Sequence, residues 1–249
     1  MATGISNRLK NGVQHPMAFD RRRIIRGAAL MLLAPSSLAV AQAQSGEGWH
    51  PLKGDDGKPV ANARLPVELT GEIEHLPGVI WVGSKSSAVT LYEFYDYNCP
   101  YCRVAAKDLH ALVTKKPELR LGLINNAILS LASMQAAKVE LALLLMKGPA
   151  VAYEFHRRLF AMPGTNDGQR ALEVAQGLGV PRRQIESAAD SEKIGGMLRE
   201  QIQLAASLGL AATPSFVAGG VGVLGYPGPK TIGGIVAAID KCGEVVCPA

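Results

Sequence analysis

The sequence predicts an α/β fold in which an all-helical block interrupts a small β-sheet, and three observations predict it. Strand-like runs rich in β-branched and aromatic residues occur before residue 130 and again after residue 210. The apolar residues between these two regions recur at helical spacing. A helical stretch also separates two of the early strands, as in a β-α-β unit. With 249 residues, 48% of them hydrophobic, the chain can bury a core of its own. We therefore expect one domain with an insertion.

The first 43 residues predict a cleavable export signal. They carry six Lys and Arg residues and one acid, Asp20, and they include an interrupted apolar stretch that is too short to span a bilayer. Small residues fit the pattern required for cleavage after Ala41 or Ala43. The pair Arg21 and Arg22 resembles a twin-arginine signal, and an ordinary secretory signal is the alternative. Both signals place the mature chain in a bacterial periplasm, where cysteines can stay oxidised.

The charge of the chain gives no argument for a nucleic-acid partner. The formal net charge is +5, but the residues after position 43 contain 20 basic and 20 acidic side chains. A balanced chain with 5% aromatic residues lacks the basic, aromatic surface of a nucleic-acid-binding protein. No second apolar segment follows the signal, so we expect no stable membrane insertion.

The elements before residue 130 should form the first part of the fold. Residues 44–77 are polar and rich in turn-forming residues, and we expect a loosely ordered arm or a short hairpin there. The first part proper, residues 78–130, contains strands at 79–83 and 88–97, a helix that begins at Pro100, and a strand at 119–128. The last two strands flank the helix and should pair in parallel.

Residues 131–209 should form the helical insertion. Gly, Pro and Asp residues divide it into five helical segments, at 134–146, 150–162, 168–179, 181–190 and 191–209. The second part of the fold, residues 210–249, begins with two short strands around the turn at Gly219 and Gly220. It ends in a helix at 229–241.

Two cysteines lie where the strand at 88–97 meets the following helix. Pro100 begins this helix, so Cys99 lies at a helix N-terminus, where free backbone N–H groups and the helix dipole favour a thiolate. We expect Cys99 to have a lowered pKa and to be an exposed nucleophile. Cys102, under the first turn, is placed to attack a mixed disulfide and release the partner. An inert buried cross-link is the alternative.

The other two cysteines, Cys242 and Cys247, follow the last helix. They could complete a four-thiolate zinc site with Cys99 and Cys102, but the spacing and the proline argue against a metal. We expect no metal and interpret Cys242 and Cys247 as a local disulfide that closes the end of the helix. Four cysteines allow three pairings, and free or regulatory thiols are the alternative.

The run LYEFYDYNCPYCR, followed far downstream by ATPSFV, resembles the DsbA family of periplasmic thiol–disulfide oxidoreductases. The resemblance covers residues 78–241 and implies a thioredoxin fold with a helical insert. It implies that Cys99 is the nucleophile and Cys102 the resolving thiol. The intervening Pro100 and Tyr101 would tune the reduction potential.

Three further residues match the DsbA family. Thr213 and Pro214 match the loop whose proline is cis and packs beside the active cysteines, and the exposed backbone of Thr213 would bind a substrate peptide as an added strand. An ordinary turn is the alternative. Glu93 matches the buried acid that relays protons to the resolving cysteine, and a solvated edge residue is the alternative.

The resemblance leaves the direction of electron flow open. Strongly oxidising members carry a histidine where this chain has Tyr101, so its oxidising power should be lower. The reductases and isomerases of the same compartment carry a long N-terminal dimerisation domain, for which residues 44–77 look too few. We expect an oxidase without a cofactor, acting on exported proteins that carry thiols or disulfides and served by a membrane redox partner. A reductase or isomerase, or a thiol-based copper-handling module, is the alternative.

Overall fold

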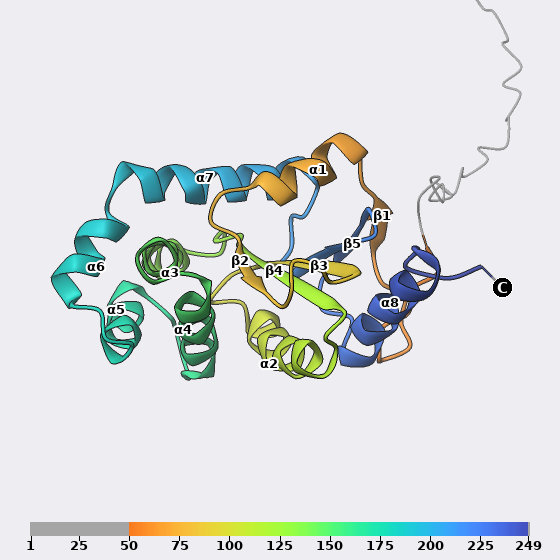
Figure 1. The fold of residues 1–249 in the computed structure, drawn as a ribbon, viewed down its shortest axis with the longest axis horizontal. Coiled ribbons are helices and arrows are strands. Elements are labelled where there is room, and N and C mark those ends of the chain that lie inside the picture. Colours follow the sequence, from red (N-terminus) through yellow and green to blue (C-terminus); the bar gives the residue numbers. More distant parts are fainter. Residues whose placement is uncertain (1–49, 249) are drawn as a thin grey trace, which may run out of the picture. The chain divides into compact units, whose positions relative to one another are not determined.

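The computed structural model describes residues 50–248, and the export signal predicted at residues 1–43 lies outside them. The centre of the fold is a six-stranded sheet with the order β1-β6-β5-β3-β4-β2 (Figure 1). The parallel pair predicted from the β-α-β unit is present, and the other neighbouring strands are antiparallel. The strands are β1 (Asn62–Arg64), β2 (Ile80–Val82), β3 (Val89–Tyr95), β4 (Leu119–Asn125), β5 (Ser215–Ala218) and β6 (Val221–Leu224).

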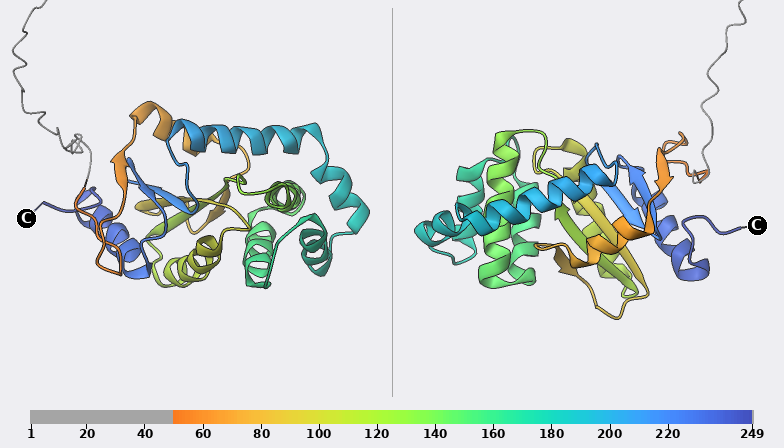
Figure 2. Two further views of the ribbon diagram at one scale, coloured as in Figure 1. Left: turned by 180° about the vertical axis from the view of Figure 1, so that it is seen from behind. Right: turned by 90° about the horizontal axis from the view of Figure 1, so that it is seen from above.

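Helices cover both faces of this sheet (Figures 1 and 2). Helices α2 (Pro100–Lys115) and α8 (Pro229–Cys242) pack together on one face, and α1 (Val67–His75) packs with α7 (Glu192–Ser207) on the other. Strand β3 lies between β5 and β4, and all but one of its residues are buried. A strand that is covered on both faces has a near-continuous hydrophobic sequence, which explains the pattern that predicted it.

The segment before β2 differs from the expected arm or hairpin. Residues 62–64 join the edge of the sheet by pairing with β6, and α1 packs on α7 and buries Ile73 completely. The side chain of Asn62 holds the approach to β1, because it accepts from the N–H of His50 and donates to the carbonyl of Val60, both at 2.8 Å. A strand of three residues and a helix of nine are too short to produce a clear periodic pattern.

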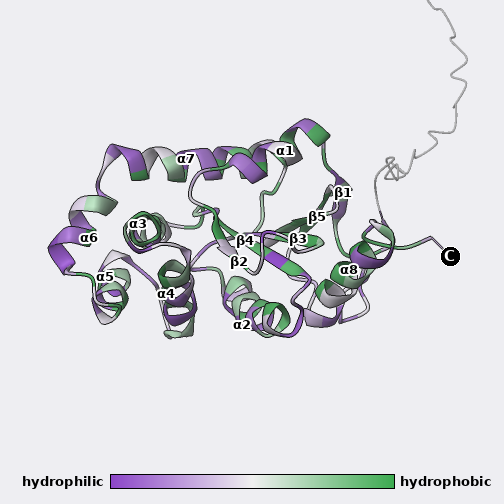
Figure 3. Ribbon diagram, viewed as in Figure 1, coloured by the Kyte–Doolittle hydropathy of each residue, from purple (hydrophilic) through white to green (hydrophobic). Residues whose placement is uncertain are grey.

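The five helices expected between β4 and β5 are present as α3 (Leu131–Lys147), α4 (Pro149–Ala161), α5 (Gly168–Gly177), α6 (Arg182–Ala189) and α7. Helix α3 contacts the other four and is largely hydrophobic around its circumference (Figure 3), as the central helix of a bundle must be. The side chains of Ser130, Asp167 and Ser191 cap α3, α5 and α7 by accepting a backbone N–H. Within residues 50–248, no helix has both the length and the apolar character needed to cross a bilayer.

Candidate active site

Strand β3 leads directly into the two neighbouring cysteines at the start of α2. The N–H of Cys99 donates to the Asp96 carbonyl at 3.1 Å, and the N–H of Arg103 donates to the Cys99 carbonyl at 3.2 Å. Cys99 is thus the N-cap residue, and Pro100 occupies the first helical position, where a missing N–H is harmless. The first turn of α2 therefore points its free N–H groups toward the Cys99 sulfur.

The sulfur of Cys99 is less exposed than the sequence predicted. Only 4% of the residue is accessible, because the Thr213 carbonyl covers the sulfur and accepts a hydrogen bond from it at 3.0 Å. The sulfur still borders an open groove of about 540 Å³. This cysteine groove is lined by Asn98, Cys99, Pro100, Arg103, Leu129, Ser130, Gly164 and Thr165. A reacting partner must therefore reach Cys99 through the groove.

The two thiols are perturbed in opposite directions. A hydrogen bond from the Cys102 thiol lowers the pKa of Cys99 to about 6, against the opposing effect of burial, with help from the Thr213 side chain and from the backbone N–H groups of Cys102 and Tyr101. Burial raises the pKa of Cys102 far above its usual range, and the contact with Cys99 and the charge of Glu93 add to this effect. At neutral pH, Cys99 is thus the thiolate and Cys102 the thiol.

Glu93 lies in the middle of the sheet and is fully buried, so it is not a solvated edge residue. Neither of its carboxyl oxygens has a hydrogen-bond partner among the described residues. Burial, together with the negative charges of Cys99 and Glu140, raises the pKa of Glu93 to about 8. A carboxyl group in this setting holds a proton at neutral pH and can give it up near that pH.

The peptide bond between Thr213 and Pro214 is cis. Pro214 directly precedes β5, and the register places Ser215 opposite Phe94, near the end of β3. The Ser215 hydroxyl donates to the Ala212 carbonyl at 2.7 Å and closes this loop on itself. Pairing between β5 and β3 therefore brings Thr213 against Cys99, 114 positions earlier in the chain.

A second buried carboxyl group, Glu140 on α3, was not predicted as part of the site. It accepts hydrogen bonds from the hydroxyls of Tyr95 and Tyr97 and, at 2.8 Å, from the side-chain amide of Asn125. Its Oε1 also lies 3.4 Å from Nδ1 of His156 on α4. All five residues are buried. The signal that could have found this cluster is a lone acid within the apolar run VELALLL.

The loop between α4 and α5 is fastened to the cysteine motif by Asn98. Its side-chain amide donates to the Ser133 hydroxyl at 3.0 Å and to the Asn166 carbonyl at 2.9 Å, and its oxygen accepts from the Asn166 N–H at 2.8 Å. Arg103 adds a second connection, because its guanidinium donates to the carbonyls of Phe160, Met162 and Gly164. The helical insertion thus forms one wall of the cysteine groove.

Exposed apolar side chains surround the cysteine groove. Tyr101 and Val104, in the first turns of α2, are 64% and 50% exposed. Ile128, Leu129 and Leu131, between β4 and α3, are also largely exposed, and Leu129 lines the groove itself. Such a patch beside a reactive sulfur suits an apolar polypeptide segment.

Cys242 and Cys247 form a disulfide in the structure, with their Cα atoms 6.0 Å apart. Cys242 is the last residue of α8, and Gly243 follows in the left-handed conformation that commonly ends helices. Within the described part of the chain, no three His, Cys, Asp or Glu side chains converge as a metal site. The two cysteine pairs are therefore separate, one at the start of α2 and one at the C-terminal end of α8.

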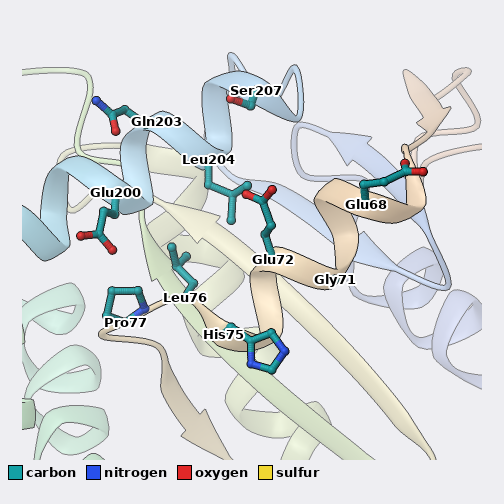
Figure 4. A pocket seen from close by; sticks show the side chains of 10 residues that line it. All are labelled: Glu68, Gly71, Glu72, His75, Leu76, Pro77, Glu200, Gln203, Leu204 and Ser207. Carbon is teal, nitrogen blue, oxygen red and sulfur yellow. The ribbon is translucent and has the colours of Figure 1, made fainter.

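A larger groove, about 650 Å³, lies between α1 and α7, on the face of the sheet opposite to α2 (Figure 4). Its lining includes three carboxylates, Glu68, Glu72 and Glu200, together with His75. Neither cysteine of the motif lines it. The larger of these two grooves is therefore not the one that contains the reactive sulfur.

Comparison with known proteins identifies the family. The family described as DSBA-like thioredoxin domain matches residues 90–236, from β3 through the helical insertion and the cis-proline loop into α8. The chain belongs to this family. The DSBA-like protein is accordingly a thiol–disulfide oxidoreductase with a thioredoxin fold and an inserted helical subdomain.

Solved structures agree with this assignment. A thioredoxin-like oxidoreductase from Silicibacter pomeroyi is 30% identical, with a TM-score of 0.60 over 66% of the DSBA-like protein and 92% of that chain. Two others share the fold at 20% identity. They are the thiol–disulfide exchange protein alpha-DsbA2 from Wolbachia pipientis (TM-score 0.60, 66% and 90% covered) and the catalytic domain of Proteus mirabilis ScsC (TM-score 0.63, 70% and 97% covered). A comparison with curated protein sequences gave no match.

Proposed function

We propose that this protein is an exported oxidase that introduces disulfides into other exported proteins through Cys99 and Cys102. The observation that supports this proposal is that the pKa values of Cys99 and Cys102, which lie within one turn of α2, are shifted in opposite directions. The pKa of Cys99 is lowered to about 6, while burial keeps Cys102 protonated. A predicted periplasmic location supports the same role, because disulfides persist in that compartment.

The proposed reaction begins with a disulfide between Cys99 and Cys102. A substrate thiolate attacks the Cys99 sulfur, a mixed disulfide forms, and Cys102 leaves with the electron pair. Glu93 supplies the proton that the buried Cys102 needs, because a thiolate is unfavourable in that setting. A second substrate thiolate then attacks the substrate sulfur of the mixed disulfide and releases Cys99 as a thiolate. The substrate loses two electrons, which the enzyme passes to a membrane redox partner.

The direction of this reaction follows from the stability of the Cys99 thiolate. A lowered pKa stabilises the dithiol form relative to the disulfide, and a stabilised reduced form makes the couple more oxidising. The exposed Tyr101 side chain contributes no charge, so the stabilisation comes from Cys102, Thr213 and the helix N-terminus. We propose that these groups take the place of the histidine found in strongly oxidising relatives.

The proposed substrate is an unfolded polypeptide. The cis-proline loop offers backbone groups at Thr213, just before β5, to an extended chain, which would pair with them as a short added strand. Apolar side chains of that chain would contact the exposed residues around the cysteine groove, Leu129 among them. We propose that Thr213 and Pro214 bind substrate in this way.

Oxidative refolding of a reduced protein with several cysteines tests the proposal. We expect the wild type to restore the disulfides and both Cys99→Ser and Cys102→Ser to be inactive, because neither variant can form the Cys99–Cys102 disulfide that oxidises the substrate. The double variant Cys242→Ser/Cys247→Ser is the matched control and should retain activity, because this pair lies at the C-terminal end of α8 and lines neither the cysteine groove nor the cis-proline loop.

Equilibration of the Cys99–Cys102 couple with glutathione measures the direction in the same preparation. A potential above that of glutathione is expected. A strongly reducing potential, or repair of scrambled disulfides without net oxidation, would identify a reductase or isomerase instead.

A further inference from the structure

A second groove, between α2 and α4, lies beside the cysteine groove. It has a volume of about 380 Å³ and is lined by Arg103, Ala106, Lys107, His110, Arg157, Phe160 and Ala161. Arg103 lines both grooves, so the second one continues from the first along α2. We call it the basic groove.

The lining of the basic groove carries positive charge without a carboxylate. Arg103 donates to backbone carbonyls, and neither Arg103 nor Lys107 forms an ion pair within the described residues. Arg157 pairs with Glu154 at 3.2 Å, but Glu154 is outside the lining. Burial, followed by the charge of Arg157, lowers the pKa of His110, so it is neutral at pH 7. The groove thus presents three guanidinium or ammonium groups.

The floor of the basic groove is apolar. Ala106, Phe160 and Ala161 lie between the cations, so an aliphatic stem can rest on the floor while a carboxylate meets the charges. Cations beside a low-dielectric wall attract an anion more strongly than isolated surface charges do. Of the polypeptide side chains, Asp and Glu fit this combination.

The spacing along α2 relates this site to the reacting sulfur. Lys107 follows Cys99 by eight residues, which is about 12 Å along a helix and about four residues of extended chain. We propose that the basic groove selects substrate polypeptides with an acidic side chain about three to five residues from the reacting cysteine. This inference rests on the proposed function, because it requires a polypeptide bound at Cys99.

Two reduced peptides test the proposal, each with one cysteine and with either Glu or Gln four residues away. We expect the oxidised protein to react with the Glu peptide on the order of five- to tenfold faster than with the Gln peptide at low salt. The preference should shrink at high salt, because the cations are solvent-accessible. Stopped-flow detection of the mixed disulfide provides the rates.

Charge reversal provides the variants for this experiment. Lys107→Glu/Arg157→Glu should abolish or reverse the preference, measured as the ratio of the rates with the Glu and Gln peptides. Arg183→Glu/Lys193→Glu makes the same change in net charge at exposed positions outside both grooves and should keep the preference. Because the peptides are the same for all variants, the effect of Glu on the peptide thiol itself cancels.

A failure of this inference can be distinguished from a failure of the proposed function. Equal rates for both peptides with the wild type, or a preference that survives Lys107→Glu/Arg157→Glu, would overturn the inference while the oxidase function stands. If neither peptide reacts with the oxidised protein, the proposed function itself is wrong.

Discussion

Three titratable groups lie together at the end of β3, and their surroundings separate their protonation states. The N-terminus of α2 and the Cys102 thiol favour the Cys99 thiolate, while burial favours protonated Cys102 and protonated Glu93. Which of these groups is the nucleophile and which hold protons is thus determined by the surroundings of each group and not by its residue type. For this reason, the pH dependence of stability reports directly on the site.

Glu93→Gln should change how stability depends on pH. Burial raises the folded-state pKa of Glu93 from about 4.5 to about 8, so its stabilising contribution is complete below pH 4.5 and is lost as the pH rises toward 8. Glutamine does not titrate. In reduced protein, the free energy of unfolding of the variant should therefore rise relative to the wild type between pH 4.5 and 8. The expected gain is about 1.4 kcal/mol for each pH unit.

Denaturant titrations at several pH values measure this difference. Parallel plots of the free energy of unfolding against pH for the wild type and Glu93→Gln would show that the buried carboxyl does not take up a proton on folding. The reactivity of the Cys99 thiol toward an alkylating reagent at each pH confirms that the site is intact in the variant.

The residue types of the site could be predicted from the sequence, but their exposure could not. Two cysteines two residues apart, a proline at the helix start and a Thr-Pro pair far downstream are local signals. The low exposure of Cys99 depends on the Thr213 carbonyl, which only strand pairing brings near. Periodicity along the chain carries no information about such a contact.

Among the elements, the side chains of Asn98 and Arg103 connect the insertion with the start of α2. Asn98 makes three hydrogen bonds that join the cysteine motif to Ser133 on α3 and to Asn166 in the loop before α5. Buried polar groups left without partners are unfavourable. The loop that forms a wall of the cysteine groove therefore depends on Asn98.

Asn98→Ala should lower the free energy of unfolding by about 2 to 3 kcal/mol, because the Asn166 backbone loses both of its partners at this position. Hydrogen exchange at the Asn166 N–H should accelerate more than exchange in β3. Ser84→Ala is the matched control, since it removes an exposed hydrogen bond to Ser86 and should change stability by less than about 0.5 kcal/mol. Similar losses for both variants would mean that Asn98 does not hold the loop.

The helices of the insertion were predictable, whereas β1 and α1 were not. The five helices of the insertion carry sustained apolar patterns and side-chain caps such as Ser130 and Asp167, so their positions agree with the sequence to within a few residues. Strand β1 has three residues and exists because it pairs with β6. Its formation is a tertiary effect that the local sequence does not encode.

In the whole domain, Glu140 connects the sheet with the insertion. It lies on α3 and receives hydrogen bonds from Tyr95 on β3 and Asn125 on β4, and it faces His156 on α4. These residues are far apart in sequence, so no local sequence pattern predicts that they meet. Buried polar networks are favourable only when their members are paired.

Glu140→Leu should lower the free energy of unfolding by about 3 to 5 kcal/mol, because it leaves the hydroxyls of Tyr95 and Tyr97 and the amide of Asn125 without their acceptor. Glu140→Gln keeps one acceptor oxygen and should lose less. Urea unfolding followed by circular dichroism measures both variants. Equal stability of Glu140→Leu and the wild type would show that the cluster contributes nothing to the fold.

Under the proposed function, the cover that Thr213 places over Cys99 restricts which substrate thiols can reach the sulfur. A thiol held inside a folded protein cannot enter the cysteine groove and reach the covered sulfur, whereas a thiol in an unfolded chain can. We therefore expect disulfides to form early, before a newly exported polypeptide has folded. The order in which its cysteines arrive would then decide which bonds are made first.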